Sequence, residues 1–412
     1  MVNFESFRLA NGLRVIVHED PSVQIAVMNL LYDVGARDED PERTGFAHLF
    51  EHLMFGGSAN IPSYDTPLQQ AGGENNAFTS NDITNYYLTV PAANLETGFW
   101  LESDRMLSLS FDPKVLDVQQ KVVVEEFKQR YLNQPYGDVW LKLRPLVYQV
   151  HPYRWATIGK EPAHVENATM EDVRNFFFRH YLPNNAILTV AGNVTVQAVR
   201  DLAEKWFGPI PSGTVPVRNL PAEPEQHSKR VLTVDADVPA NALYKVFPMV
   251  SRSHSDFHTT DVLCDILGKG NSSRLYRQLV REKEIFTNLA CYNTGSIDPG
   301  MMVVSGRTKG GISPVEAEKY VDELLAEFQA SGPGEQELTK VLNQAETIHE
   351  FGEVEVMNRA MNLAYCELLG NPGLINTELE IIRSIGIADI RRVASETIRE
   401  DKSSVLYYNR KS

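Results

Sequence analysis

The sequence predicts an α+β protein built from two related domains. A chain of 412 residues is longer than one hydrophobic core normally spans. Short β-rich runs alternate with amphipathic helical runs, and the same order of elements starts again after a proline-rich stretch. We therefore expect an N-terminal domain over residues 1–211, an extended linker over 212–228 and a homologous C-terminal domain over 229–412.

The first half opens with a β-hairpin, a strand and a helix. An Asn-Gly pair separates two runs with alternating apolar residues, which is the pattern of a tight hairpin. The run IAVMNLLYDVG predicts a strand that ends at Gly35. The run PERTGFAHLFEHLMFGG predicts a helix that opens at Pro41 and closes at Gly56 and Gly57.

Further strands and helices complete the first half. Residues 66–91 predict a short helix, a glycine break and two strands. The run FDPKVLDVQQKVVVEEFKQRYL, residues 111–132, predicts a long helix that begins after Pro113. Residues 184–194 predict a strand, and residues 195–211 predict the helix that closes this half.

The second half repeats this order. Strands are predicted in RVLTVDADVPANALYKVFPM and LACYNTGSIDPGMMVVSGRT, helices in DFHTTDVLCDILGKG and SSRLYRQLVREKEI, and two long helical stretches at the end. The run DVLCDILGKG corresponds in order to HLFEHLMFGG, which is consistent with an internal duplication. The second copy carries Asp261, Cys264 and Asp265 where the first has two histidines and a glutamate. We therefore expect the first domain to carry the chemistry.

Composition and charge argue against several function classes. The sequence is 43% hydrophobic and 23% charged, as in soluble globular proteins, and no apolar run is long enough to cross a bilayer. The net charge of −15 argues against nucleic acid or an anionic membrane as partner. Three widely spaced cysteines predict buried apolar side chains. The absence of a signal-peptide pattern predicts a cytoplasmic protein, or a periplasmic one if a signal peptide was removed before residue 1.

Two histidines and a glutamate interrupt the apolar helix within residues 45–57. His48 and His52 are four residues apart, so on a helix they share one face and can reach one metal ion. Neutral imidazole suits zinc, which keeps three protein ligands and one water in catalytic sites. Glu51 projects near the same face, where it can act on the water without binding the metal. The order H-x-x-E-H is the inverted-zincin signature, and the apolar surroundings argue against a merely structural pair of histidines.

The third ligand is expected on the long helix over residues 111–132. That helix offers Glu125 and Glu126 directly after three valines. Gln119, Val122 and Glu126 share one helix face, and Glu125 lies about 100° away around the axis. Periodicity alone therefore leaves both glutamates open.

Several stretches together resemble the pitrilysin and mitochondrial-processing-peptidase family of zinc peptidases. They are HLFEH, GGENNAFTSNDITNYY, VVVEEF, HPYRWATIG, FFFRHYLPNNAILTVAGNV and, in the second half, GKGNSSRLYRQLVREKEI. The resemblance covers nearly the whole chain and is greatest to the small bacterial members with two domains. It implies two homologous α/β-sandwich domains, each a mixed sheet with helices on one face, that enclose a peptide-binding chamber.

The resemblance also implies roles for individual residues. His48, His52 and Glu126, the last 74 residues after His52, would hold one zinc ion per chain. Glu51 would be the general base. Gln119 stands where the family often has another glutamate, and this departure removes a negative charge beside the ligand set.

Two further stretches correspond to substrate-binding positions in the family. Asn76, Ala77, Phe78 and Thr79 match an edge strand that would pair with an extended peptide. Without the resemblance, a polar loop would be the preferred interpretation of these residues. In the second half, Arg281 matches an arginine that holds the substrate in active single-chain relatives.

The partner of that arginine in the family is a tyrosine seven residues later. Here the position is Asn288, and Tyr292 lies four residues further along. We therefore expect a homodimer, or a heterodimer in which a related chain supplies an Arg/Tyr pair.

Together these observations predict a zinc-dependent metalloendopeptidase for unfolded or short peptides, and the zinc-bearing subunit of a dimer. One alternative is a self-sufficient homodimeric peptidase. The other is a non-catalytic assembly or core-type subunit, against which the intact zinc motif argues.

Overall fold

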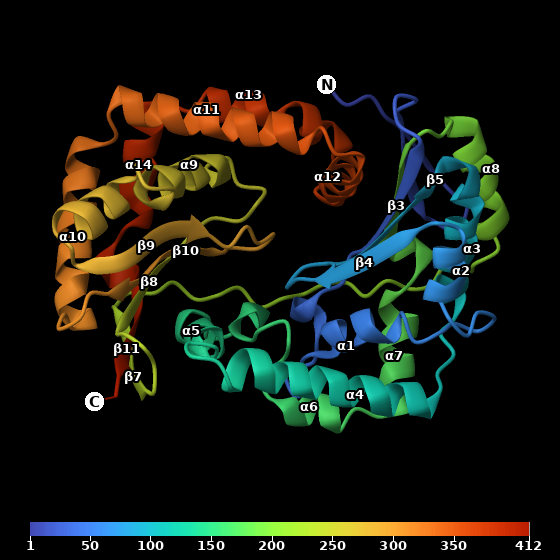
Figure 1. Cartoon of the computed structure of the whole chain (residues 1–412), viewed down its shortest axis with the longest axis horizontal. Helices are drawn as coiled ribbons and strands as arrows, with labels where there is room; N and C mark the ends of the chain where they lie inside the picture. The colour runs from blue at the N-terminus through green and yellow to red at the C-terminus, as the bar shows by residue number, and fades with distance from the viewer. Residues whose placement is uncertain (412) are drawn as a thin grey trace. The chain divides into compact units, whose positions relative to one another are not determined.

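The computed structural model describes residues 1–411 and contains two compact units (Figure 1). Unit 1 consists of residues 1–130, 155–220 and 350–377, and unit 2 of residues 131–154, 221–349 and 378–412. Each unit combines one sheet with helices, which confirms the predicted α+β class. The predicted domains over residues 1–211 and 229–412, and the linker over 212–228 between them, stay predictions. Each compact unit contains segments from both halves of the sequence.

Unit 1 is built on a six-stranded mixed sheet in the order β1-β2-β6-β3-β5-β4. Its strands are β1 (Glu5–Arg8), β2 (Arg14–Glu19), β3 (Ile25–Tyr32), β4 (Glu74–Thr79), β5 (Thr84–Pro91) and β6 (Ala186–Gly192). β2 and β6 are parallel, and the other neighbouring pairs are antiparallel. The predicted hairpin is the β1-β2 pair.

Unit 2 is built on a five-stranded sheet in the order β7-β11-β8-β10-β9. Its strands are β7 (Arg230–Ala236), β8 (Ala242–Pro248), β9 (Phe286–Asn293), β10 (Met301–Thr308) and β11 (Ser404–Arg410). β7 and β11 are parallel, and the other pairs are antiparallel. The prediction that the chain ends in helices was wrong, because the final strand β11 inserts between β7 and β8.

The two sheets share one topology. Counted along the chain from β2 and from β7, the strands of both units lie in the spatial order 1-5-2-4-3, with β1 as an addition in unit 1. Helix α1 (Phe46–Leu53) lies between β3 and β4 in the chain, and α9 (Phe257–Gly268) lies between β8 and β9. This equivalence supports the internal duplication and the predicted correspondence of the two helices.

Most helices of each unit lie on one face of its sheet (Figure 1). The remaining helices of unit 1 are α2 (Asp65–Gln70), α3 (Leu95–Leu107), α4 (Pro113–Phe127), α6 (Pro162–Glu166), α7 (Met170–His180), α8 (Val196–Trp206) and α12 (Val356–Leu368). Those of unit 2 are α5 (Val139–Val147), α10 (Pro314–Ser331), α11 (Glu335–Gly352), α13 (Glu378–Arg383) and α14 (Ile387–Thr397). Two π-helical turns, Lys128–Leu132 and Tyr276–Glu282, follow α4 and precede β9.

A single helix from the other half of the sequence covers the opposite face of each sheet. On unit 1, Leu363 and Ala364 of α12 join a buried cluster with Leu31 and Ile187. On unit 2, the buried residues Val139, Leu143 and Val147 of α5 join a cluster with Val246, Val303 and Leu406. This reciprocal exchange was not predicted.

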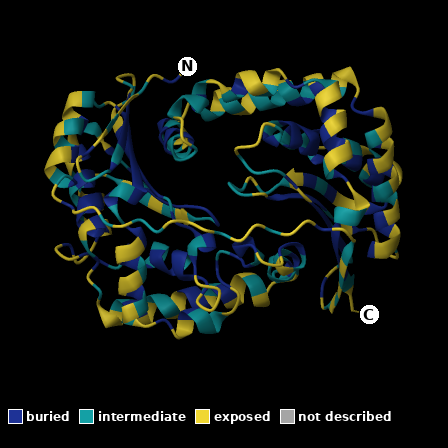
Figure 2. Cartoon of the chain, turned by 180° about the vertical axis from the view of Figure 1, so that it is seen from behind, coloured by how far each residue is buried: buried dark blue, intermediate teal, exposed yellow. Residues whose placement is uncertain are grey.

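The exchange explains the composition of the central strands. β3 (IAVMNLLY) is buried at every position after Ile25, because helices cover both faces of its sheet. Figure 2 shows buried residues concentrated in the strands of each unit, with exposed residues along the helices. Residues 212–228 form no helix or strand.

Candidate metal centre

Helix α1 carries the H-x-x-E-H sequence and is anchored by its apolar face. Phe46, Leu49, Phe50 and Leu53 are buried, and the ring of Phe50 stacks on Tyr181 at a centroid distance of 5.3 Å. Because the apolar side chains occupy the inner face, the polar residues of the motif lie on the half-buried side.

The helix begins later than predicted. Its first residue is Phe46, and Pro41 lies outside it, in a turn closed by a bridge between Asp40 and Arg43. The start is set by Gly45, which has φ 87°. A Cβ atom there would lie 2.6 Å from the carbonyl oxygen of Ile158. Only glycine fits this position without strain.

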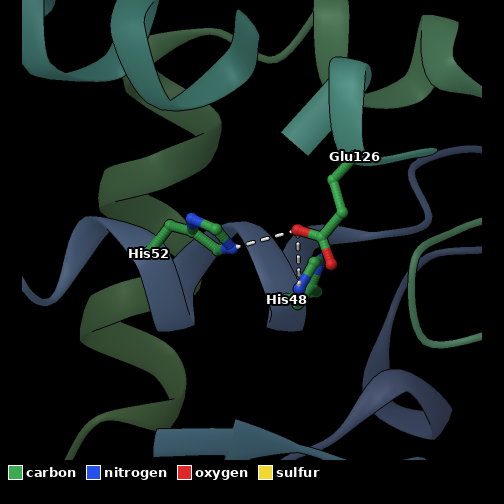
Figure 3. Close-up of side chains that lie close together, drawn as sticks. All are labelled: His48, His52 and Glu126. Carbon is green, nitrogen blue, oxygen red and sulfur yellow. Dashed lines mark ion pairs between the residues drawn. The ribbon is translucent and has the colours of Figure 1, made fainter. Parts of the chain in front are cut away.

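His48 and His52 lie side by side on α1, and Glu126 of α4 faces both (Figure 3). The imidazole centroids are 4.9 Å apart. Oε2 of Glu126 lies 3.7 Å from Nε2 of His48 and 3.5 Å from Nε2 of His52. The three potential ligand atoms all lie within 4.8 Å of one another.

The geometry distinguishes between the two glutamates that periodicity left open. The side chain of Glu126 is 18% exposed and points toward the histidines, whereas that of Glu125 is 57% exposed and lies 3.9 Å from Lys128. The cation beside Glu126 is Arg130, whose Nη1 is 3.0 Å from Oε1. Glu126 is therefore the glutamate placed to complete a three-residue donor set.

The electrostatics favour the protonation states that a metal requires. Burial lowers the pKa of His48 to about 4, although Glu126 opposes this shift. A hydrogen bond from His52 lowers the pKa of Glu126, and burial opposes that shift. A neutral imidazole and a charged carboxylate are the forms that bind metal ions. Two imidazole nitrogens and one carboxylate oxygen fit the three-ligand set of catalytic zinc.

One feature of His48 departs from the usual pattern of metal-binding histidines. Such residues normally donate their second ring N–H to a carbonyl or carboxylate. Nδ1 of His48 is buried, and the described part of the chain offers it no hydrogen-bond partner. The neighbours of the His48 ring are the imidazole of His52 and the carboxylate of Glu126.

Glu51 lies on α1 between the two histidines and is held from the sheet. Oγ1 of Thr79, at the end of β4, donates a hydrogen bond to Oε2 of Glu51 at 2.7 Å. Burial raises the pKa of Glu51, and the bond from Thr79 opposes this shift. A carboxylate with a raised pKa is suited to accept a proton near neutral pH. Nothing in the sequence indicated this contact, because Thr79 was predicted only as part of the edge strand.

Residues Asn76, Ala77, Phe78 and Thr79 belong to β4, so the polar-loop interpretation is wrong. β4 is an edge strand that pairs with β5 on one side. Exposure alternates along it, with Asn76 and Phe78 exposed and Ala77 and Thr79 half-buried. An edge strand presents unpaired main-chain groups on its open side. Peptide binding by this strand stays a prediction.

The remaining residues that the resemblance singled out lie on α4 and in unit 2. Gln119 is half-buried on α4 and, within residues 1–411, forms no described hydrogen bond to the histidines or Glu126. In unit 2, Arg281 is exposed on the π-helical turn Tyr276–Glu282, 5.9 Å from the ring of Tyr276. Asn288 is exposed on β9, and its Oδ1 accepts the backbone N–H of Arg307 at 3.1 Å.

The motif-equivalent residues of α9 have structural partners. Asp261 accepts a hydrogen bond from Asn293, and Asp265 pairs with Lys269 at 2.6 Å. Cys264 is buried. These contacts are consistent with a second copy that keeps the helix without the chemistry.

A second acidic cluster in unit 2 was not predicted. Its members are Glu318, Asp322 and Glu400. The ammonium group of the buried Lys245 lies within 2.9 Å of all three carboxylates. Lys245 and Lys229, whose Nζ lies 2.7 Å from both Glu318 and Glu400, offset most of this negative charge, so the cluster is a structural ion network.

Comparison with known proteins points to one peptidase family. The sequence pattern described as "Insulinase (Peptidase family M16)" matches residues 14–142, and "Peptidase M16 inactive domain" matches residues 167–345. A zinc protease PqqE from Helicobacter pylori is 29% identical over 98% of this chain and 92% of its own. A probable mitochondrial-processing peptidase subunit beta from Arabidopsis thaliana is 26% identical over 72% of this chain and 58% of its own.

The fold comparison agrees with the sequence comparison. The crystal structure of a protease from Helicobacter pylori superposes with a TM-score of 0.94 and 26% identity, covering 99% of this chain and all of the other. None of the helices within residues 1–411 is long and apolar enough to cross a membrane.

Proposed function

Because this chain belongs to the M16 family of peptidases, we propose that it is a zinc-dependent endopeptidase acting on unfolded or short peptides. The observation that carries the proposal is the convergence of His48, His52 and Glu126, whose ligand atoms lie within 4.8 Å of one another. The names of its relatives, among them a zinc protease, support the same chemistry.

The proposal gives each polar residue around α1 one task. His48, His52 and Glu126 would hold one zinc ion. Bound zinc is a Lewis acid that acidifies water and polarises a carbonyl oxygen. Glu51 would take the proton from the attacking water and pass it to the leaving amine. Thr79 would keep the Glu51 carboxylate in place through its hydrogen bond.

The edge strand β4 would bind the substrate. An extended peptide can add to an open sheet edge through main-chain hydrogen bonds, which tolerates many side chains. Thr79 ends this strand and also contacts Glu51, so a peptide paired with residues 76–79 would lie beside the proposed base. This contact supports β4 as the substrate strand.

A partner chain is the second part of the proposal. In unit 2, Arg281 is exposed and available to a substrate, but the tyrosine position seven residues later is Asn288, whose side chain is bound to a backbone N–H. We therefore favour a dimer in which a related chain supplies an Arg/Tyr pair, over a homodimer that is active alone.

Metal analysis combined with peptide hydrolysis tests the function. The purified chain should contain about one zinc ion, and a chelator should abolish cleavage of an unfolded peptide until zinc is restored. Glu51→Gln should retain the zinc and lose the cleavage. Zinc-independent cleavage, or full activity of Glu51→Gln, would contradict the proposal. Strong cleavage by the isolated chain would remove the need for a different partner chain.

A further inference from the structure

The N-terminus of α1 cannot cap itself. Many helices begin with a Ser, Thr, Asp or Asn whose side chain accepts a hydrogen bond from one of the first free N–H groups. Here the capping position is Gly45, which has no side chain. The contact that a Cβ atom would make with Ile158 excludes Ser, Thr, Asp and Asn from this position. The helix that carries both histidines therefore depends on an acceptor from elsewhere in the chain.

Glu39 supplies this acceptor with both of its carboxylate oxygens. Oε2 accepts the N–H of Gly45 at 2.9 Å, and Oε1 accepts the N–H of Ala47 at 2.8 Å. The residue is 6% exposed. Burial raises its pKa to about 8, and the two backbone hydrogen bonds oppose this shift. Because each of the two oxygens accepts an N–H group, the geometry requires the ionised form of Glu39, although burial makes its charge costly.

The segment before Gly45 is held independently. Nδ1 of His164 accepts the N–H of Thr44 at 3.1 Å, and Oγ1 of Thr44 accepts the N–H of Lys160 at 2.8 Å. The bond from Ala47 to Glu39 lies inside the helix, one residue before His48. Of these contacts, Glu39 is the one that acts directly on the backbone beside the first histidine.

We propose that Glu39 is a positioning residue for the metal ligands: its carboxylate fixes the backbone of α1 immediately before His48 and thereby sets where both imidazoles meet Glu126. The inference rests on the proposed zinc site. Glu39 can have this role because α1 is only eight residues long. Over about two turns, a shift at the first turn is transmitted to His48, Glu51 and His52 together. Ligands must be held within roughly 0.5 Å for tight binding.

Zinc affinity, measured apart from stability, tests the inference. Glu39→Gln keeps the size of the side chain but replaces one acceptor oxygen by an N–H donor, so one of the two helix bonds must break. We expect zinc to bind this full-length variant roughly tenfold more weakly or worse in competition with a coloured chelator. Glu39→Asp, whose shorter side chain reaches only one N–H group, should show a smaller loss and serves if Glu39→Gln does not fold.

Thr195→Ala is the matched control. Oγ1 of Thr195 caps α8 by accepting the N–H of Ala198 at 3.2 Å, in the same unit but on another helix. This variant should lower the melting temperature of the metal-free protein and leave zinc affinity unchanged. The cobalt-substituted proteins add a second readout, because the visible spectrum reports the ligand geometry, which should change in Glu39→Gln only.

The outcomes separate the two proposals. If the unchanged protein binds no zinc, the proposed function fails. If it binds zinc and Glu39→Gln binds with the same affinity and the same cobalt spectrum while losing thermal stability, Glu39 is an ordinary cap and the inference is overturned. If Thr195→Ala weakens zinc as much as Glu39→Gln, the effect is general destabilisation, and the inference is overturned as well.

Discussion

Nη2 of Arg359, on α12, donates a hydrogen bond to Oδ2 of Asp20 at 2.7 Å, although 339 residues separate them in the sequence. Nη1 of the same guanidinium lies 2.7 Å from Nε2 of His18. Nδ1 of His18 is 2.6 Å from the carbonyl oxygen of Asn3, so it carries the proton and leaves Nε2 as an acceptor. The ion pair of Arg359 with Asp20 and its contact with His18 thus hold α12 beside β2.

Removal of this guanidinium should release α12. Arg359→Leu removes the guanidinium from the half-buried Asp20, which keeps only its bonds from Ser22, and leaves Nε2 of the buried His18 without its donor. We expect the free energy of unfolding to fall by about 3 kcal/mol, as measured by urea denaturation. Arg392→Leu is the control, because its pair with Asp256 is 46% exposed on the arginine side and should contribute less than about 1 kcal/mol. Equal losses in the two variants would contradict a special role for Arg359.

The hydrogen bonds that Asp20 accepts from Ser22 and Arg359 also predict a loss of stability in acid. Hydrogen bonds from Ser22 and then Arg359 lower the pKa of Asp20 to about 2. In the unfolded chain the pKa of an aspartate is about 3.9. A depressed folded pKa stabilises the protein above the unfolded value, and this contribution is lost as the pH falls from about 4 toward 2. The stability difference between the natural chain and Asp20→Asn should therefore shrink over this range. A constant difference from pH 6 to pH 2 would refute the assignment.

The third ligand can be identified by comparing neighbouring glutamates. Glu126 lies 3.5 Å from His52, whereas Glu125 points away and is 57% exposed. Glu126→Gln should reduce zinc content and affinity by at least about tenfold, while Glu125→Gln should match the unchanged protein. Metal analysis after dialysis measures both. Loss of zinc from Glu125→Gln alone would reassign the ligand.

Thr79 should affect catalysis without affecting the metal. Thr79→Val removes the donor to Glu51, and Thr79→Ser keeps it. Because the bond from Thr79 opposes the rise in the pKa of Glu51, the valine variant should need a higher pH to ionise this base. We expect kcat/KM to fall roughly tenfold and its acidic limb to move to higher pH. Zinc content should stay constant and the serine variant should behave normally. A valine variant with an unshifted pH profile would exclude this role.

The sequence predicted the elements with strong local signals. The hairpin, the helix α1 and the long helix α4 all follow from turn residues and periodicity. β11 was missed because SVLYYNR is short and follows several helices, which made another helical element the simpler expectation. The late start of α1 was missed because the acceptor for its first N–H groups is Glu39, a residue outside the helix.

The sequence alone could not predict the parts of the site that depend on contacts between residues far apart in the chain. Helical spacing placed His48 and His52 on one face, but only the packing of α4 against α1 separates Glu126 from Glu125. The exchange of α5 and α12 was also beyond the sequence. The apolar periodicity of a helix shows which of its faces is buried, but it does not identify the sheet that this face covers.

The exchange of α5 and α12 between the two halves of the sequence has a consequence for biosynthesis. Within residues 1–411, the sheet of unit 1 contains no strand beyond Gly192, yet one of its faces is covered by a helix that ends at Leu368. At about 5–20 residues per second, residues 193–368 take roughly 10–35 s to synthesise. For that time Leu31, Ile187 and their apolar neighbours in the nascent chain are not covered by α12. Aggregation of ribosome-bound fragments should therefore be greatest just before α12 emerges.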